Sequence, residues 1–148
     1  MGSKDTAERT RILERAVPAW LRLARVFAKI NRASVEHLRA YDLSLAQFDV
    51  LAHVGSAEGI TQQELADHLL VTKGNITQLL DRMERGGLLV RRQQGRANRL
   101  YLTEQGRKLF DEAVPAQEAH ITRQLAALSP DELAELHRLL RTLDRSLH

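Results

Sequence analysis

Apolar residues recur three and four positions apart in two long tracts, one toward each end of the chain. This spacing marks one face of an amphipathic helix. Pro18 lies inside the first tract, and because it lacks an N–H and clashes with the preceding turn, we expect it to kink this helix or to start a second one. The apolar members of the first tract are Leu13, Val17, Trp20, Leu21, Leu23, Ala24, Phe27, Ile30 and Val35.

The C-terminal tract is predicted to form two helices. Thr103 is a candidate N-cap for the first of them, and Pro115 should bend it. The second opens at Ser129-Pro130-Asp131-Glu132, where a serine cap, a proline in the first turn and a glutamate at the third position make a strong start signal. Its apolar stripe is a leucine seam made of Leu133, Leu136, Leu139, Leu140, Leu143 and Leu147.

Between these tracts the pattern predicts a helix-turn-helix. Ser44 can cap a helix that ends near Gly55. Residues 61–87 read TQQELADHLLVTKGNITQLLDRMERGG, in which Thr61 and Glu64 form a capping box and Thr72 can cap a second helix. Two short helices joined by about three residues suit a unit whose second helix enters the major groove of DNA. The apolar positions of the two helices are Leu65, Ala66, Leu69, Ile76, Leu79, Leu80 and Met83.

A β-hairpin is predicted directly after this unit. Residues 88–92 read as a strand, Gln93 to Asn98 as a polar turn around Gly95, and residues 99–102 as a returning strand. A helix-turn-helix followed by such a hairpin is a winged helix, in which Arg96 can reach the DNA backbone or the adjacent minor groove.

Composition narrows the class of protein. The 148 residues include no cysteine, which excludes disulfides, thiol redox sensing and cysteine metal sites. No stretch approaches the roughly 18 apolar residues of a membrane span, and the charged N-terminus has no apolar signal core, so a cytoplasmic location is expected. The six histidines are dispersed and there is no Gly-rich phosphate loop or local nucleophile signature, so we expect neither an enzyme nor a metal site or cofactor.

The positive charge is concentrated in the central region. The whole chain carries +3, whereas residues 73–99 contain seven basic and two acidic side chains, a surplus of five. Such a segment attracts polyanions through counterion release. A charge run by itself is more often a solvated face with no partner, but together with the predicted helix-turn-helix it makes double-stranded DNA the expected partner.

The expected fold is mainly α, a winged helix-turn-helix with a small β-hairpin wing, flanked by N- and C-terminal dimerisation helices. Residues 45–103 would form the DNA-binding domain, and residues 1–44 and 104–148 the helical dimerisation region. A short central module offers too little apolar surface to cover both long tracts, so we expect the leucine seam to pack against the first helix of a second copy.

Polar side chains off the apolar stripe of the second motif helix are the candidate DNA contacts. Asn75, Thr77 and Gln78 are expected at base edges, and Lys73 and Arg82 at phosphates. Helix N-termini attract anions, so the two capping threonines, Thr61 and Thr72, are also candidates for phosphate contacts. Arg91, Arg92 and Arg99 alternate around the hairpin, so only some of them should face DNA, and Arg85 can pair with Asp81 or Glu84. The full set of candidates is Thr61, Thr72, Lys73, Asn75, Thr77, Gln78, Arg82, Arg92 and Arg96.

Residues 61–106 resemble the MarR (multiple antibiotic resistance regulator) family of bacterial transcription factors. The resemblance rests on Leu79-x-Asp81-x-Met83-Glu84-x-x-Gly87-Leu88, the wing arginine, and Leu102-Thr103-x-x-Gly106, and it extends in layout to the whole chain. It implies a homodimer with interdigitated terminal helices that reads a pseudo-palindromic operator, usually as a repressor. It also implies a small aromatic or anionic effector bound between the two layers, with Trp20, Phe27, Phe48 and His53 as candidate lining.

Two positions depart from the family pattern. Gln94-Gly95-Arg96 stands where the family's wing usually carries Asp-x-Arg, so the wing arginine lacks its usual carboxylate partner. Gln78 stands where arginine is frequent, which favours adenine over guanine as the contacted base. The alternative function is an architectural protein that binds DNA without regard to sequence.

Overall fold

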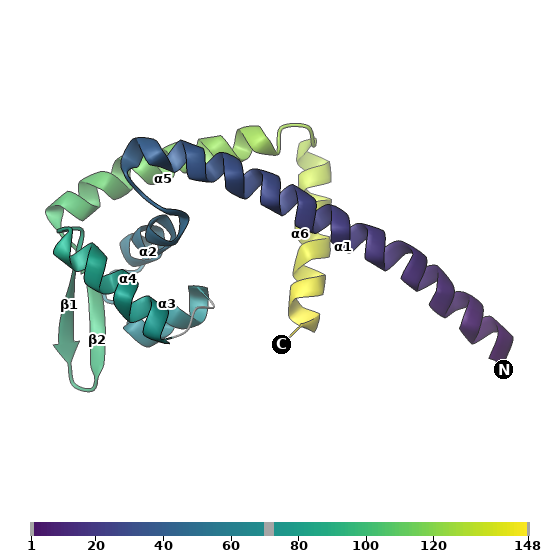
Figure 1. The fold of residues 1–148 in the computed structure, drawn as a ribbon, viewed down its shortest axis with the longest axis horizontal. Coiled ribbons are helices and arrows are strands. Elements are labelled where there is room, and N and C mark those ends of the chain that lie inside the picture. The colour runs from purple at the N-terminus through teal and green to yellow at the C-terminus, as the bar shows by residue number, and fades with distance from the viewer. Residues whose placement is uncertain (1, 70–72, 148) are drawn as a thin grey trace.

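The computed structural model describes residues 2–69 and 73–147, and its architecture is a helical arch above a winged-helix module (Figure 1). The arch contains α1 (Gly2–Leu38) and α5 (Glu104–Gln124), and α6 (Pro130–Ser146) descends from the C-terminal end of α5. The module contains α2 (Leu45–Ser56), α3 (Gln62–Leu69), α4 (Lys73–Arg85) and a two-stranded hairpin. The expected mainly α fold with a β-hairpin is confirmed.

Helix α1 does not follow the sequence expectation at Pro18. The helix continues without a break through this residue, so the predicted second start is wrong. Proline removes a single backbone hydrogen bond, to the carbonyl of Glu14, and this stretch of the helix is exposed so that water can take that bond. Pro115 likewise lies inside an uninterrupted α5.

The start signals read from the sequence are confirmed wherever the structure describes them. Ser44 forms a capping box with Gln47, and Ser129 forms one with Glu132. The Thr103 hydroxyl accepts a hydrogen bond of 3.0 Å from the amide of Gly106. These caps satisfy amide groups that have no partner within the helix. The predicted cap at Thr72 lies outside the described residues.

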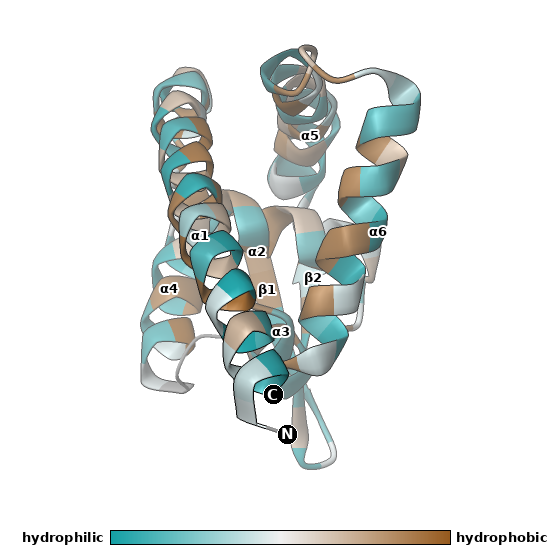
Figure 2. Ribbon diagram, turned by 90° about the vertical axis from the view of Figure 1, so that its right-hand side faces the viewer, coloured by the Kyte–Doolittle hydropathy of each residue, from teal (hydrophilic) through white to brown (hydrophobic). Residues whose placement is uncertain are grey.

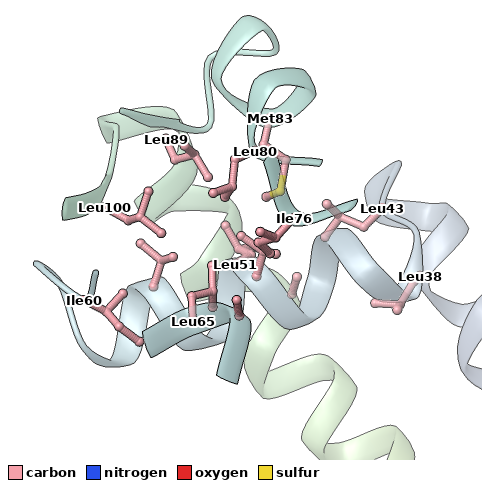
Figure 3. Close-up of a cluster of buried hydrophobic side chains, with 14 residues drawn as sticks. Leu38, Leu43, Leu51, Ile60, Leu65, Ile76, Leu80, Met83, Leu89 and Leu100 are labelled. Carbon is pink, nitrogen blue, oxygen red and sulfur yellow. The ribbon is translucent and has the colours of Figure 1, made fainter. Parts of the chain in front are cut away.

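Most of the core lies inside the module, where α2, α3, α4 and the hairpin meet, and Leu38 of α1 and Ala113 of α5 join it from the arch (Figure 3). Leu51, Leu65 and Leu80 are completely buried, one from each of the three helices. Helical spacing on each helix places these side chains on the face toward the other two. Together they fix the second motif helix against the first, and the fully or nearly fully buried set also includes Val50, Val54, Ile76, Met83, Leu89 and Leu100.

The wing is longer and its turn tighter than the sequence predicts. Strands β1 (Leu89–Gln94) and β2 (Ala97–Leu102) pair in antiparallel register from Leu89 opposite Leu102 to Gln94 opposite Ala97. The turn is therefore Gly95-Arg96 rather than six residues. Glycine at the first central position, with a φ of +62°, supplies the backbone conformation that a two-residue hairpin needs.

Two apolar helical faces remain uncovered within this chain. Figure 2 shows apolar bands along α1 and α6, and in Figure 1 the N-terminal half of α1 and the whole of α6 extend beyond the module. Trp20 is 63% exposed, and Leu143 on α6 is 49% exposed. No helix among residues 2–69 and 73–147 is long and apolar enough to cross a membrane.

Candidate nucleic-acid interface

The helix-turn-helix presents one polar face away from the arch. A capping box starts α3: the Glu64 amide donates to the Thr61 hydroxyl at 3.1 Å, and the Thr61 amide donates to the Glu64 carboxylate at 3.4 Å. On α4, Ile76 is buried against the core, which turns Asn75 and Gln78 outward to solvent. Both side chains therefore stand on the exposed side of the second motif helix.

Thr77 connects the two motif helices. The Gln62 side-chain amide donates a hydrogen bond of 3.0 Å to its hydroxyl. This bond holds the start of α3 beside the first half of α4. Gln62 did not emerge from the sequence analysis, because a residue directly after a helix cap carries no periodic signal that distinguishes a contact across helices from exposure.

A groove of about 320 Å³ separates this helix pair from the wing. Thr61, Thr77 and Arg96, all candidates from the sequence, line it from α3, α4 and the hairpin turn. Gln63 and Asn98 also line it and were missed. The structure thus brings the first turn of α3, the outward face of α4 and the tip of the wing onto one surface (Figure 1).

The arginines of the hairpin fall into two groups, those bonded to neighbouring elements and those with exposed guanidinium groups. Arg91 forms ion pairs with Asp81 and with Glu84, the latter at 3.0 Å, and its amide donates to the Glu84 carboxylate at 2.9 Å. The hydrogen bond from the Arg91 amide, followed by the one from its guanidinium, holds the pKa of the Glu84 carboxyl below its usual range. The wing is thereby tied to α4, and both carboxylates proposed as partners of Arg85 bind Arg91 instead.

Arg99 and Arg92 have different surroundings. The Arg99 guanidinium donates a hydrogen bond of 2.8 Å to the carbonyl of Gly59 and is half-buried, so it joins the hairpin to the loop before α3. The Arg92 guanidinium lies 5.1 Å from the centre of the Tyr101 ring and is exposed. Arg82 on α4 and Arg96 at the turn are exposed as well. Three of the candidate arginines therefore keep their charge at the surface, while the side chains of Thr72 and Lys73 lie outside the described residues.

A second hollow lies between the module and the arch. Its volume is about 860 Å³, and it is bounded by α1, α2 and α5. Phe27 and Phe48 line it, whereas Trp20 and His53, the other two effector candidates, are not among its lining residues. His53 instead turns its Nδ1 to the carbonyl of Asp49, at 2.8 Å, and its ring packs against His68.

A polar cluster joins α1 to α5 beside this hollow. The buried Gln117 donates to the Ser34 hydroxyl at 3.0 Å and contacts His37 Nδ1 at 2.9 Å. The His37 and His120 rings stack with centroids 4.5 Å apart. Among the residues with described positions, no group of three potential ligands could hold a metal ion.

The buried helix pair, the outward polar helix and the hairpin with its exposed arginine define a winged helix-turn-helix protein. Residues 41–99 match the family model described as MarR family. The chain is 30% identical over 132 residues to the uncharacterized HTH-type transcriptional regulator YkoM of Bacillus subtilis, covering 87% of this chain and 86% of that protein. The chain belongs to the MarR family of transcriptional regulators, which are not enzymes.

Two solved structures bear on the site. A mutant of MarR from Escherichia coli complexed with operator DNA is 28% identical, with a TM-score of 0.79, covering 86% of this chain and 94% of that one. The MarR family protein Rv2887 of Mycobacterium tuberculosis complexed with salicylic acid is 30% identical, with a TM-score of 0.65, covering 82% of this chain and 92% of that one. The first of these relatives is complexed with DNA, and the second with a small aromatic acid.

Proposed function

We propose that this protein is a homodimeric repressor that reads a pseudo-palindromic operator in double-stranded DNA and is released by a small-molecule effector. The observation that carries the proposal is the shared groove of α3, α4 and the wing, where Thr61, Thr77 and Arg96 come together. A helix with exposed amide and hydroxyl groups suits base edges in the major groove, and a wing arginine suits the phosphates or minor groove beside it.

The individual contacts are proposed from the sequence and from the exposed positions on α3, α4 and the wing. Asn75, Thr77 and Gln78 contact base edges from α4, and Arg82 and Lys73 contact phosphates. Thr61 and Thr72 add phosphate contacts at the starts of α3 and α4, where helix N-termini favour anions. Arg92 and Arg96 supply the positive charge of the wing. In support, a structural relative is complexed with operator DNA.

The homodimer is proposed from the uncovered faces of α1 and α6. A monomer rarely exposes an apolar surface that spans two long helices, and a second copy is the simplest cover for it. Residues 1–44 and 104–148 then form the dimerisation region, and residues 45–103 the DNA-binding domain. A dimer places two recognition helices about one helical turn apart, which requires an operator with two half-sites.

Release by an effector is proposed from the hollow lined by Phe27 and Phe48. It lies where the DNA-binding module meets the arch, so a ligand there can favour one spacing of the two recognition helices over another. A relative of this chain is complexed with salicylic acid. Relief of repression requires that the ligand bind the wrongly spaced conformation more tightly.

The test is selection of bound duplexes from a random pool with the full-length protein at near-physiological salt. Enrichment of an inverted repeat supports the proposal, and binding without enrichment supports the alternative of an architectural DNA-binding protein. Arg96→Ala should weaken binding to the selected duplex by about tenfold to a hundredfold, the cost of one to three kcal/mol for a lost charged contact. Arg141→Ala, an equal charge change on α6, is the matched control and should leave affinity nearly unchanged.

A further inference from the structure

The hollow between α1, α2 and α5 is lined by acidic side chains. This is unexpected, because a relative in the same family is complexed with salicylic acid, which is itself an acid. Two carboxylates, Asp49 from α2 and Glu118 from α5, line the hollow. Among its described lining residues there is no lysine, arginine or histidine. Neither carboxylate forms an ion pair within residues 2–69 and 73–147.

The neutral polar groups of the hollow offer little to an anion. The Gln117 amide already donates to Ser34, and its carbonyl oxygen contacts His37. The Thr122 hydroxyl donates to the backbone carbonyl of Glu118 at 2.8 Å. An anionic ligand needs donors or cations to replace its water, and among the described lining residues only Asn31, the Ser34 hydroxyl and the second N–H of Gln117 remain for that purpose, all of them uncharged.

The apolar lining suits a different ligand. Phe27 and Phe48 bring aromatic rings to the hollow, and Leu45, Val114 and Ile121 add aliphatic surface. Aromatic faces attract cations, and a nearby carboxylate adds a direct Coulomb attraction. Partial desolvation raises the pKa of the Asp49 carboxyl, although His53 opposes this shift, so an arriving positive charge would stabilise the ionised form.

We propose that the effector of this protein is a lipophilic aromatic cation, held by Asp49 and Glu118 with its rings against Phe27 and Phe48. This inference rests on the proposed effector-relieved function, because it names the chemical class of ligand for the same hollow. The carboxylates set the sign of the charge that is accepted, and the phenylalanines select flat apolar molecules. Salicylate and similar acids are disfavoured by like-charge repulsion.

The experiment compares two dyes that share a xanthene skeleton and differ in charge. Fluorescence anisotropy with the full-length protein measures the affinity of rhodamine 6G, a cation, and fluorescein, an anion. Rhodamine 6G should bind at least about tenfold more tightly. Replacing both carboxylates, in Asp49→Asn with Glu118→Gln, should remove roughly tenfold of its affinity, since exposed ion pairs are worth up to about fivefold each.

The control is Asp111→Asn with Glu112→Gln, which makes the same charge change on α5 at side chains that do not line the hollow. It should leave both affinities unchanged, and circular dichroism should show that both double variants fold. Equal losses in the control, or tighter binding of fluorescein than of rhodamine 6G, would overturn the proposed ligand class.

A second measurement separates this inference from the proposed function. The same dyes are added to the protein bound to its selected duplex, and release of DNA is followed. Rhodamine 6G that binds through the carboxylates without releasing DNA supports the ligand class and contradicts effector relief. Release of DNA by salicylate but not by rhodamine 6G supports effector relief and contradicts the ligand class.

Discussion

The central module buries its apolar residues, whereas the helices at the two ends of this chain expose many of theirs. Every member of the buried apolar core lies between Leu38 and Ala113. Within residues 2–69 and 73–147, every large apolar residue that is strongly exposed lies on α1, on α6 or at Leu147, directly after α6. Both regions are equally helical, so the difference is one of burial and not of secondary structure.

This contrast shows that local signals and burial are separate requirements. Helix α6 has a serine cap, a capping box with Glu132 and a proline in its first turn, which are sufficient to define where it begins. None of these features gives its leucines a partner. A helix that is well specified but uncovered has an apolar face that is available for assembly, whereas the module folds around its own core.

The largest expected effect comes from replacing one leucine by alanine in each region and comparing stability with dimerisation. Leu80→Ala removes a fully buried side chain from the module and should lower the free energy of unfolding by about 2–5 kcal/mol, because it leaves a cavity among α2, α3 and α4. Denaturant unfolding measures this loss. Sedimentation of the folded variant should show the same dimer dissociation constant as the parent.

Leu143→Ala is the matched exchange in α6 and should have the reverse pattern. It should weaken the dimer by at least about tenfold, since burying one leucine is worth about 1.5–3 kcal/mol, while the helical content of the folded protein stays the same. A Leu143→Ala protein that dimerises like the parent would show that α6 is not part of the interface. A Leu80→Ala protein that is as stable as the parent would contradict the assignment of the core.

A smaller effect is expected at the joint between the wing and α5. A Cβ added at Gly106 would lie 1.9 Å from the carbonyl oxygen of Leu88, a backbone atom that cannot move without shifting β1. Gly106→Ala should therefore cost about 1–3 kcal/mol of unfolding free energy through overpacking. Gly74→Ala, in the exposed part of α4 with no atom within 4 Å, is the control.

The control should change stability in the opposite direction. Alanine is favoured over glycine inside a helix by about 1 kcal/mol, so Gly74→Ala should be neutral or stabilising in thermal unfolding. If both variants lose the same stability, the close approach of Gly106 to β1 is not what determines the result.

The outcome at each element shows which parts of the molecule a sequence can predict. Caps at Ser44 and Ser129 depend on residues three positions apart, so they could be identified without tertiary information. Pro18 misled the prediction because its cost depends on whether the surroundings can replace one hydrogen bond. The pairing of Arg91 with Asp81 and Glu84 joins two elements, and no local pattern distinguishes it from a pair on the surface of α4.

The candidate sites follow the same division. The exposed side of α4 could be deduced from helical spacing, since the buried positions leave the rest outward. The lining of the hollow required the relative placement of three helices, which explains why Phe27 and Phe48 line it and Trp20 and His53 do not. Gln62 and Asn98 were missed in the groove because neither belongs to a periodic pattern.

The smallest expected effect lies at the seam between α1 and α5, where the His37 and His120 rings stack. Desolvation, first of all, and then the neighbouring His37 and Arg123 lower the pKa of the His120 imidazole below its ordinary value of 6.5. Its Nε2 is buried and has no hydrogen-bond partner among residues 2–69 and 73–147. The Tyr41 ring also contacts His37, with the two ring centroids 5.9 Å apart.

The sign of the pH dependence follows from this lowered pKa. Because the folded protein disfavours the charged imidazole, the unfolded chain binds the proton more readily, and stability falls as the pH drops through 6.5 toward the lower folded pKa. The change should be a fraction of the about 1.4 kcal/mol that one pKa unit represents. Urea unfolding between pH 7.5 and 5.5 should show a flatter profile for His120→Leu than for the parent, whereas His137→Leu, on the exposed face of α6, should keep the parent's slope. Identical slopes in all three proteins would mean that protonation at the α1–α5 seam does not affect the stability of the fold.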